Sequence, residues 1–173
     1  MPYDVDDYTL LSGVLSIAKI TAGTVGTYTD VGNCPKFEFT ADKEAVEHQE
    51  SRTPHKYRDQ RVVLVKGYTI SFDLDGRNLE NLQMFLMGTL DGTTKILGFQ
   101  NLDQEYALKL TEDNRKGKNF IWVFHRCQIE PEGALALIGE NQFAKMSFSA
   151  VSLADLAGNP ESPFFHTEEQ TTP

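Results

Sequence analysis

The chain has 173 residues, with a hydrophobic fraction of 40% and a charged fraction of 24%, as in an ordinary soluble globular protein. This length indicates one domain with a sizeable core. The formal net charge of -9 argues against a surface that grips nucleic acid, because phosphate binding needs clustered lysine and arginine. The same charge is compatible with a surface that DNA passes without binding.

The first residues, MPYDVDDYTLLSGV, have neither the basic nor the apolar segment of a secretory signal, so we expect no signal peptide. No apolar run approaches the roughly 18 residues of a membrane span, so no membrane partner is expected. Two cysteines do not make a disulfide framework. We therefore expect Cys34 and Cys127 to be reduced, with Cys127 packed in a strand.

Alternation of apolar and polar residues predicts a chain made mainly of strands. Residues 120–129 have apolar side chains on both faces in their first half, which is typical of a central strand. The expected strands are 13–21, 36–42, 62–74, 94–99, 105–111, 120–129, 134–138 and 143–152.

One helix is predicted, over residues 78–87. Asp75 or Asn78 can cap its start, and Gly88 can end it. A helix this short cannot cover a large sheet. The expected fold class is therefore mainly β: a β-sandwich or barrel of two packed antiparallel sheets with one short flanking helix. The apolar stripe of the helix consists of Leu79, Leu82, Phe85 and Leu86.

The segment between strands 36–42 and 62–74 is polar and lacks an apolar period, so we expect a long inter-strand loop over residues 44–61. The strand VGNCPKFEFT, the loop EAVEHQESRTPHKYRDQR and the strand and helix KGYTISFDLDGRNLENLQMFLMG follow in the order found in one family. In this order and spacing the chain resembles the tail tube proteins of phages with long, non-contractile tails. The resemblance covers about a third of the chain well.

The resemblance implies a structural virion protein, not an enzyme, without a cofactor. Such proteins assemble as hexameric rings whose sheets join into a barrel, and the rings stack into a tube through which DNA is ejected. The implied partners are other copies of the chain and tape-measure, tail-terminator and distal tail proteins. DNA passes the lumen without specific binding. The implied location is the tail of the virion, with assembly in the host cytoplasm.

The predicted loop balances its charges, with four acidic and four basic residues in a strongly acidic chain. One reading is a solvated, flexible loop. The other is a self-complementary surface that contacts an identical subunit in the next ring, since a repeated heterologous contact builds an open filament. The candidate inter-ring residues are Glu44, Glu47, Glu50, Arg52, Lys56, Arg58, Asp59 and Arg61.

The strands that flank the loop each have a polar face, and fixed negative charge there discourages capture of passing phosphate. We expect these residues to line the lumen of a tube. The candidate lumen-facing residues are Glu38, Thr40, Asp42, Thr69, Ser71 and Asp73.

The expected organisation is an N-terminal segment (1–12), a tail-tube β domain (13–153) and an extended C-terminal arm (154–173). The arm loses the alternation and has four acidic residues without a lysine or arginine, so it cannot fold alone. Phe164 and Phe165 are its apolar exception. They either pack back on their own domain or contact a neighbouring subunit.

Motifs of catalysis are missing: the sequence has no GxSxG elbow, no GxxxxGK[ST] loop and no HExxH pair of histidines. His48 and His55 lie in the same predicted loop, which leaves a shared zinc site open, although we expect no metal. Two alternative functions remain open. One is a tube-forming protein of a bacterial secretion system, and the other is a small-molecule-binding β-barrel with an apolar interior pocket.

Overall fold

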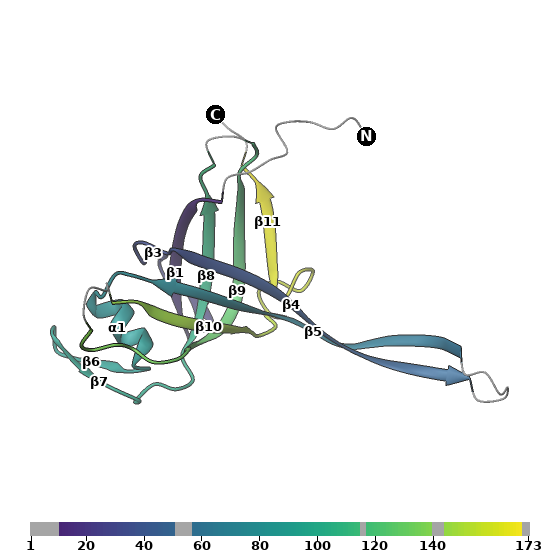
Figure 1. The fold of residues 1–173 in the computed structure, drawn as a ribbon, viewed down its shortest axis with the longest axis horizontal. Helices are drawn as coiled ribbons and strands as arrows, with labels where there is room; N and C mark the ends of the chain where they lie inside the picture. Colours follow the sequence, from purple (N-terminus) through teal and green to yellow (C-terminus); the bar gives the residue numbers. More distant parts are fainter. Residues whose placement is uncertain (1–10, 51–56, 115–116, 140–143, 171–173) are drawn as a thin grey trace.

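A computed structural model describes residues 11–50, 57–114, 117–139 and 144–170. The fold is mainly β, with one nine-stranded sheet, one two-stranded ribbon and a short helix, and every strand pair is antiparallel (Figure 1). The expected fold class is thus confirmed. The elements are β1 (Gly13–Thr21), β2 (Thr24–Val25), β3 (Thr29–Asp30), β4 (Lys36–Glu50), β5 (Tyr57–Leu74), α1 (Leu79–Phe85), β6 (Thr89–Asp91), β7 (Lys95–Leu97), β8 (Glu105–Glu112), β9 (Phe120–Pro131), β10 (Met146–Ser152) and β11 (Phe165–Glu169).

Strand β9 is the centre of the large sheet and belongs to both of its layers. The strand order is β2-β1-β8-β9-β10-β5-β4, with β3 added to β1 and β11 added to β9. Residues 120–124 of β9 pair with β11, whereas residues 127–131 pair with β10. A register shift against β8 lies between these two parts, and a bulge of this kind bends a strand. The two packed layers are therefore joined by hydrogen bonds through β9, rather than forming separate sheets.

Aromatic side chains fill the space where the layers cross. In Figure 1, β4 and β5 cross the direction of β1, β8 and β9. The fully buried rings include Tyr68, Phe72, Phe124 and Phe148. Phe72 and Phe148 stack at a centroid distance of 5.0 Å, and Phe37 of β4 reaches Phe124 of β9 at 6.0 Å. Burial of such rings gives the body a single apolar core.

Helix α1 begins and ends close to the predicted positions. The Asn78 side chain caps it by accepting from the backbone N–H of Asn81 at 2.7 Å. Met87, rather than a glycine, adopts the left-handed conformation after the last turn, with a φ of 44°. Gly88 has a different role: a Cβ there would lie 2.6 Å from the Leu97 carbonyl oxygen, so only glycine allows β7 to approach. No helix among the described residues is long and apolar enough to cross a membrane.

Several sequence-based boundaries were wrong. The loop expected over 44–61 is β strand wherever it is described, because residues 44–50 pair with residues 57–65. Residues 134–138 form no strand, since Gly133 turns the chain with a φ of 79° and leaves Ile138 fully in solvent. The C-terminal residues 165–169 form β11, which the loss of alternation did not reveal. Most of the expected N-terminal segment, residues 1–10, lies outside the described residues.

Candidate functional site

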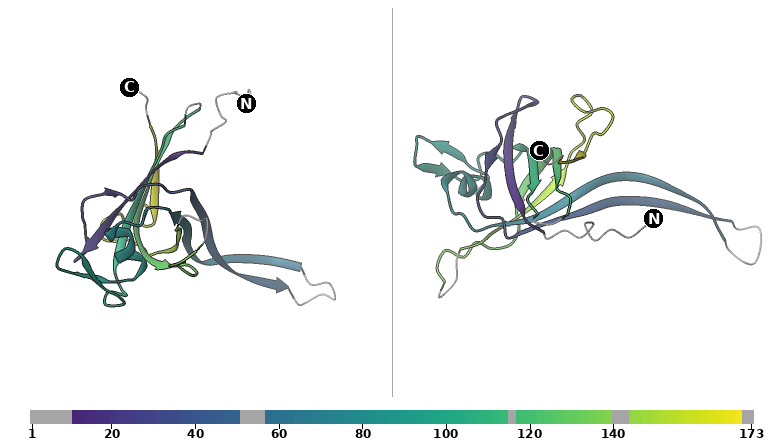
Figure 2. Two further views of the ribbon diagram at one scale, coloured as in Figure 1. Left: turned by 60° about the vertical axis from the view of Figure 1, so that its left-hand side comes forward. Right: turned by 90° about the horizontal axis from the view of Figure 1, so that it is seen from above.

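A two-stranded hairpin projects from the body of the protein, and we call it the long hairpin: residues 43–50 of β4 and 57–66 of β5. Figures 1 and 2 show it extending well beyond the rest of the chain in all three views. Strand β10 pairs with β5 only over residues 69–74, and β4 pairs only with β5. Both outer edges of the long hairpin therefore expose backbone N–H and C=O groups without a strand partner among the described residues.

The hairpin leaves the body at Gly67, where strand β10 ends. The Ser152 hydroxyl accepts a hydrogen bond from the Tyr68 backbone N–H at 2.7 Å. A Cβ on Gly67 would lie 2.8 Å from the same hydroxyl oxygen. Glycine at this position thus allows Ser152, the last residue of β10, to approach β5. The residues of β5 that precede Gly67 do not pair with β10.

Apolar side chains are exposed on the long hairpin. Val46, Val62, Val63 and Leu64 have exposed fractions of 54%, 55%, 53% and 59%. Register shifts on either side of this region twist the hairpin, between Glu44 and Ala45 and between His48 and Gln49. Val46 and Val62 are directly paired and share one face, and exposed branched apolar residues on an unsupported hairpin are typical of a surface that a partner covers.

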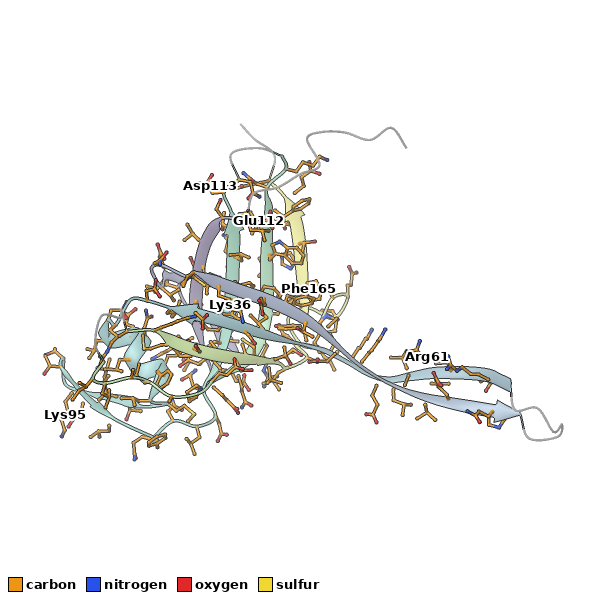
Figure 3. All side chains as sticks on the ribbon, in the orientation of Figure 1. Lys36, Arg61, Lys95, Glu112, Asp113 and Phe165 are labelled. Carbon is orange, nitrogen blue, oxygen red and sulfur yellow. The ribbon has the colours of Figure 1, made fainter. Side chains whose placement is uncertain are left out.

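The charges of the long hairpin pair partly with one another. Glu47 contacts Arg58 at 2.9 Å and Arg61 at 3.7 Å, and Figure 3 labels Arg61 on the hairpin. The charge balance in the sequence suggested that these residues contact another subunit. The structure shows that Glu47, Arg58 and Arg61 contact one another within the hairpin. Both pairs are well exposed, and pairs of this kind contribute about 0–1 kcal/mol. Of the other predicted interface residues, Glu44 is exposed, Glu50 and Asp59 lie within the strands, and Arg52 and Lys56 lie outside the described residues.

The six residues predicted to line a lumen share one face of the sheet. Directly paired residues in antiparallel strands project to the same side, and Glu38 pairs with Ser71 while Thr40 pairs with Thr69. Thr69 Oγ1 donates to Asp42 Oδ2 at 2.7 Å. Sequence reasoning missed the other half of this surface, because strand order places distant segments beside β5. We call the whole surface the polar face: Glu38, Thr40, Asp42, Thr69, Ser71 and Asp73 with Ser147, Ser149, Gln128 and Glu130.

Asp73 differs from the exposed acidic residue that the sequence suggested. It is only 4% exposed, and Lys145 Nζ lies 2.7 Å from its Oδ2. Burial acts to raise the pKa of Asp73, but hydrogen bonds from Lys145 and Ser147 outweigh it and the pKa is lowered. Lys36 likewise pairs with Glu38 at 3.0 Å. The polar face therefore carries both positive and negative charge. In the described part of the chain, its acidic residues Asp42 and Glu130 form no ion pair.

A family model described as "Protein of unknown function UCP028589" matches residues 8–96. The chain belongs to this family. The matched residues include the long hairpin, the β4 and β5 part of the polar face and helix α1. A search of curated proteins found no match.

Two solved structures are similar over almost the whole chain. One is a chain of the sheath–tube complex of an extracellular contractile injection system in its extended state, with 10% identity, a TM-score of 0.38, and coverage of 98% of this chain and 93% of that one. The other belongs to the tube-terminating cap of the anti-feeding prophage, with 10% identity, a TM-score of 0.36, and coverage of 98% and 100%. At these scores the similarity assigns neither a fold nor a function to this family member.

Phe164 and Phe165 lie against their own domain. Both pack on the core, and Phe165 contacts the rings of Phe124 and Trp122 at centroid distances of 5.9 Å and 6.4 Å. The His125 backbone N–H donates to the Phe164 carbonyl at 3.1 Å. The described part of the expected C-terminal arm thus packs on its own domain. Its strand β11 pairs with the part of β9 that β10 does not reach.

Aromatic rings such as Phe37, Phe72 and Phe124 fill much of the space between the layers, and a groove of about 330 Å³ opens between β4 and the strands β1 and β8. A groove with a volume of about 350 Å³ lies between β1 and α1. Cys127 is buried, and burial raises the pKa of its thiol, so both its position and its free state match the expectation for a packing residue. No group of three or more possible metal ligands occurs among the described residues, and His55 lies outside them.

Proposed function

We propose that this chain is a structural subunit that assembles with copies of itself into the tube of a phage tail. The observation that carries the proposal is the long hairpin, with two open edges and exposed Val46, Val62, Val63 and Leu64. An isolated two-stranded hairpin is at best marginally stable in water. A hairpin of this length is retained most simply where a partner covers it.

The partner proposed is another copy of the chain. The hairpin projects from one side of an asymmetric body, so its contact with a second copy is heterologous, and repetition of such a contact gives rings or open filaments. The resemblance of residues 31–88 to tail tube proteins selects stacked, hexameric rings among these assemblies. By the same resemblance, tape-measure, terminator and distal tail proteins are its further partners in the virion.

The polar face is the surface that we assign to the lumen. It is rich in short hydroxyl side chains, and its positive charges are held by Lys36–Glu38 and Lys145–Asp73 pairs. Cations engaged in this way are poorly placed to bind phosphate, and Asp42 and Glu130 add net repulsion. DNA can then pass along the face without being captured.

Assembly is tested by size-exclusion chromatography and negative-stain electron microscopy of the purified chain at increasing concentration. We expect rings with a central hole or tubes. A strictly monomeric protein at every concentration would contradict self-assembly. Closed globular oligomers without a central hole would contradict the tube.

The role of the long hairpin is tested with Val62→Ser combined with Leu64→Ser. We expect a folded subunit that no longer forms tubes, because the variant removes apolar surface that folding leaves exposed. The matched control is Leu102→Ser combined with Leu156→Ser, which alters residues that are 60% and 68% exposed elsewhere on the body. Tubes formed equally by both double variants would remove the hairpin from the interface.

A further inference from the structure

His125 on β9 and His166 on β11 face each other where the C-terminal strand joins the body. His125 Nε2 lies 3.1 Å from His166 Nδ1, and the ring centroids are 4.8 Å apart. The backbone holds both rings in place. His166 pairs with Val123 in the ladder, and the His125 N–H donates to the Phe164 carbonyl at 3.1 Å.

The geometry of the two rings matches a shared metal ion. Two imidazole nitrogens that bind one Zn²⁺ at about 2.0–2.1 Å and at an angle near 90–110° lie roughly 2.9–3.4 Å apart, with ring centroids roughly 4.5–5.2 Å apart. Both observed distances fall within these ranges. Two rings in line across a straight contact of the same length would have centroids more than about 5 Å apart, so the two rings are tilted away from a straight contact, with an interplanar angle of 36°.

We propose that His125 and His166 bind a divalent transition metal ion of the zinc, copper and nickel class, which clamps β11 onto β9. Imidazole nitrogen is a preferred ligand of these three ions. The ion bridges two residues that are 41 positions apart in sequence and lie on neighbouring strands.

Glu168 lies beside the outer ring nitrogen of His166. His166 Nε2 lies 3.7 Å from Glu168 Oε1, which is longer than a hydrogen bond. The inner nitrogens, His125 Nε2 and His166 Nδ1, form a hydrogen bond with each other, and binding of an ion replaces it. Glu168 is then near the position of the outer carboxylate that commonly orients a metal-binding histidine.

The charges around the pair also admit a cation. The nearest positive side chain along β9, Arg126, is held in a bidentate pair by Glu105, with nitrogen–oxygen distances of 2.7 and 2.6 Å. The Asp155 carboxylate is engaged by Gly158 and Asn159, whose nitrogens lie 3.0 and 2.8 Å from its oxygens.

The described residues add no third protein ligand to the pair, so water completes the coordination of the ion. Such a site binds less tightly than a structural site with four protein ligands. His125 is 7% exposed, whereas His166 is half-buried, so the ion enters from the side of β11. Its effect is local: it fixes the strand that carries Phe165 onto the aromatic core.

The experiment uses the whole chain and Zn²⁺ as the probe, with isothermal titration calorimetry at neutral pH. We expect His166→Gln to lower the affinity for Zn²⁺ at least tenfold. Glu168→Gln should lower it less, because Glu168 orients a ligand and does not bind the ion itself. Thr167→Gln, on the same strand, is the matched control and should leave binding unchanged. Circular dichroism of each variant confirms that β11 and the body remain folded.

A second measurement locates the ion independently of any variant. In the wild type, Zn²⁺ should shift the imidazole nitrogen resonances of His125 and His166 and leave those of His48 unchanged. Absence of Zn²⁺ binding at millimolar concentration would overturn the proposal. Binding that is equal in wild type and His166→Gln, or shifts confined to other histidines, would overturn it as well.

Discussion

Phe39 of β4 and Phe165 of β11 pack edge to face, with ring centroids 5.3 Å apart and ring planes at 66°. Phe39 lies at the base of the long hairpin, and Phe165 belongs to the last strand of the chain. Their contact joins the two layers of the sheet at the point from which the hairpin projects. The C-terminal strand therefore supports the element that we propose to mediate assembly.

Replacing Phe165 should test this support. Phe165→Ala removes ring contacts with Phe39, Tyr68, Trp122 and Phe124, and we expect a loss of about 2 kcal/mol in the free energy of unfolding, less than for a fully buried ring. Urea denaturation measures the change. Leu102→Ala, at a residue that is 60% exposed, is the control and should change stability by less than about 0.5 kcal/mol.

Asn81 should hold helix α1 to the body through its side-chain amide. Its Nδ2 donates to the Val31 carbonyl at 2.9 Å and to the Gly76 carbonyl at 2.8 Å, and the residue is 2% exposed. Asn81→Asp keeps the shape and removes both donors, so we expect a loss of about 2–3 kcal/mol in chemical denaturation. Asn78→Asp keeps the capping acceptor and should be nearly neutral. Equal effects of the two variants would contradict this role of Asn81.

Asp73 and Lys145 should make stability depend on pH in the acid range. The pKa of Asp73 is lowered in the folded protein, so its contribution is fully present above its ordinary value of 3.8 and is lost as the pH falls below it. We expect Asp73→Asn to be destabilising at pH 6, with a difference from wild type that shrinks between about pH 4 and pH 2. Urea denaturation across this range measures it. A difference that is constant with pH would contradict the ion pair.

Lys145→Met should destabilise the protein more than Asp73→Asn combined with Lys145→Met. The single variant leaves the carboxylate of Asp73 nearly buried without its cation, and we expect it to cost about 1–3 kcal/mol at neutral pH. The double variant removes the charge as well. Equal losses in the two variants, measured by denaturation, would show that Lys145 does not compensate Asp73.

The polar face should control the passage of DNA rather than assembly. Asp42→Lys combined with Glu38→Lys leaves the core untouched, because both side chains are exposed, and places positive charge on the surface assigned to the lumen. We expect tubes to form and DNA ejection from virions to slow severalfold. Lys109→Glu, on β8 in the other layer, is a charge-reversal control. Unchanged ejection kinetics would remove this face from the lumen.

Local patterns were sufficient for much of the body. Residues 68–74 alternate because one face of the strand is buried, and residues 36–42 alternate because Phe37 and Phe39 pack on rings of the core. The helix is delimited by a cap that acts within one turn. The shared polar face of β4 and β5 followed from the same alternation. Its continuation onto Ser147 and Ser149 did not, because strand order is not contained in a local period.

The long hairpin shows where sequence patterns end. A strand without a buried face has no hydrophobic alternation, so residues 44–61 resemble a polar loop, although backbone pairing with each other makes the described ones strands. The same reason hid β11, whose five residues contribute one ring to the core and pair with β9 only through the tertiary fold.

The sequence by itself thus determined a mainly β chain, a capped helix and an acidic composition, since these depend on residue type and short-range spacing. Only the tertiary structure decided which distant groups meet: Lys145 with Asp73, Glu47 with Arg58, and His125 with His166. The physical reason is that such contacts depend on strand order and register, which are fixed by the packing of the whole core rather than by any local segment.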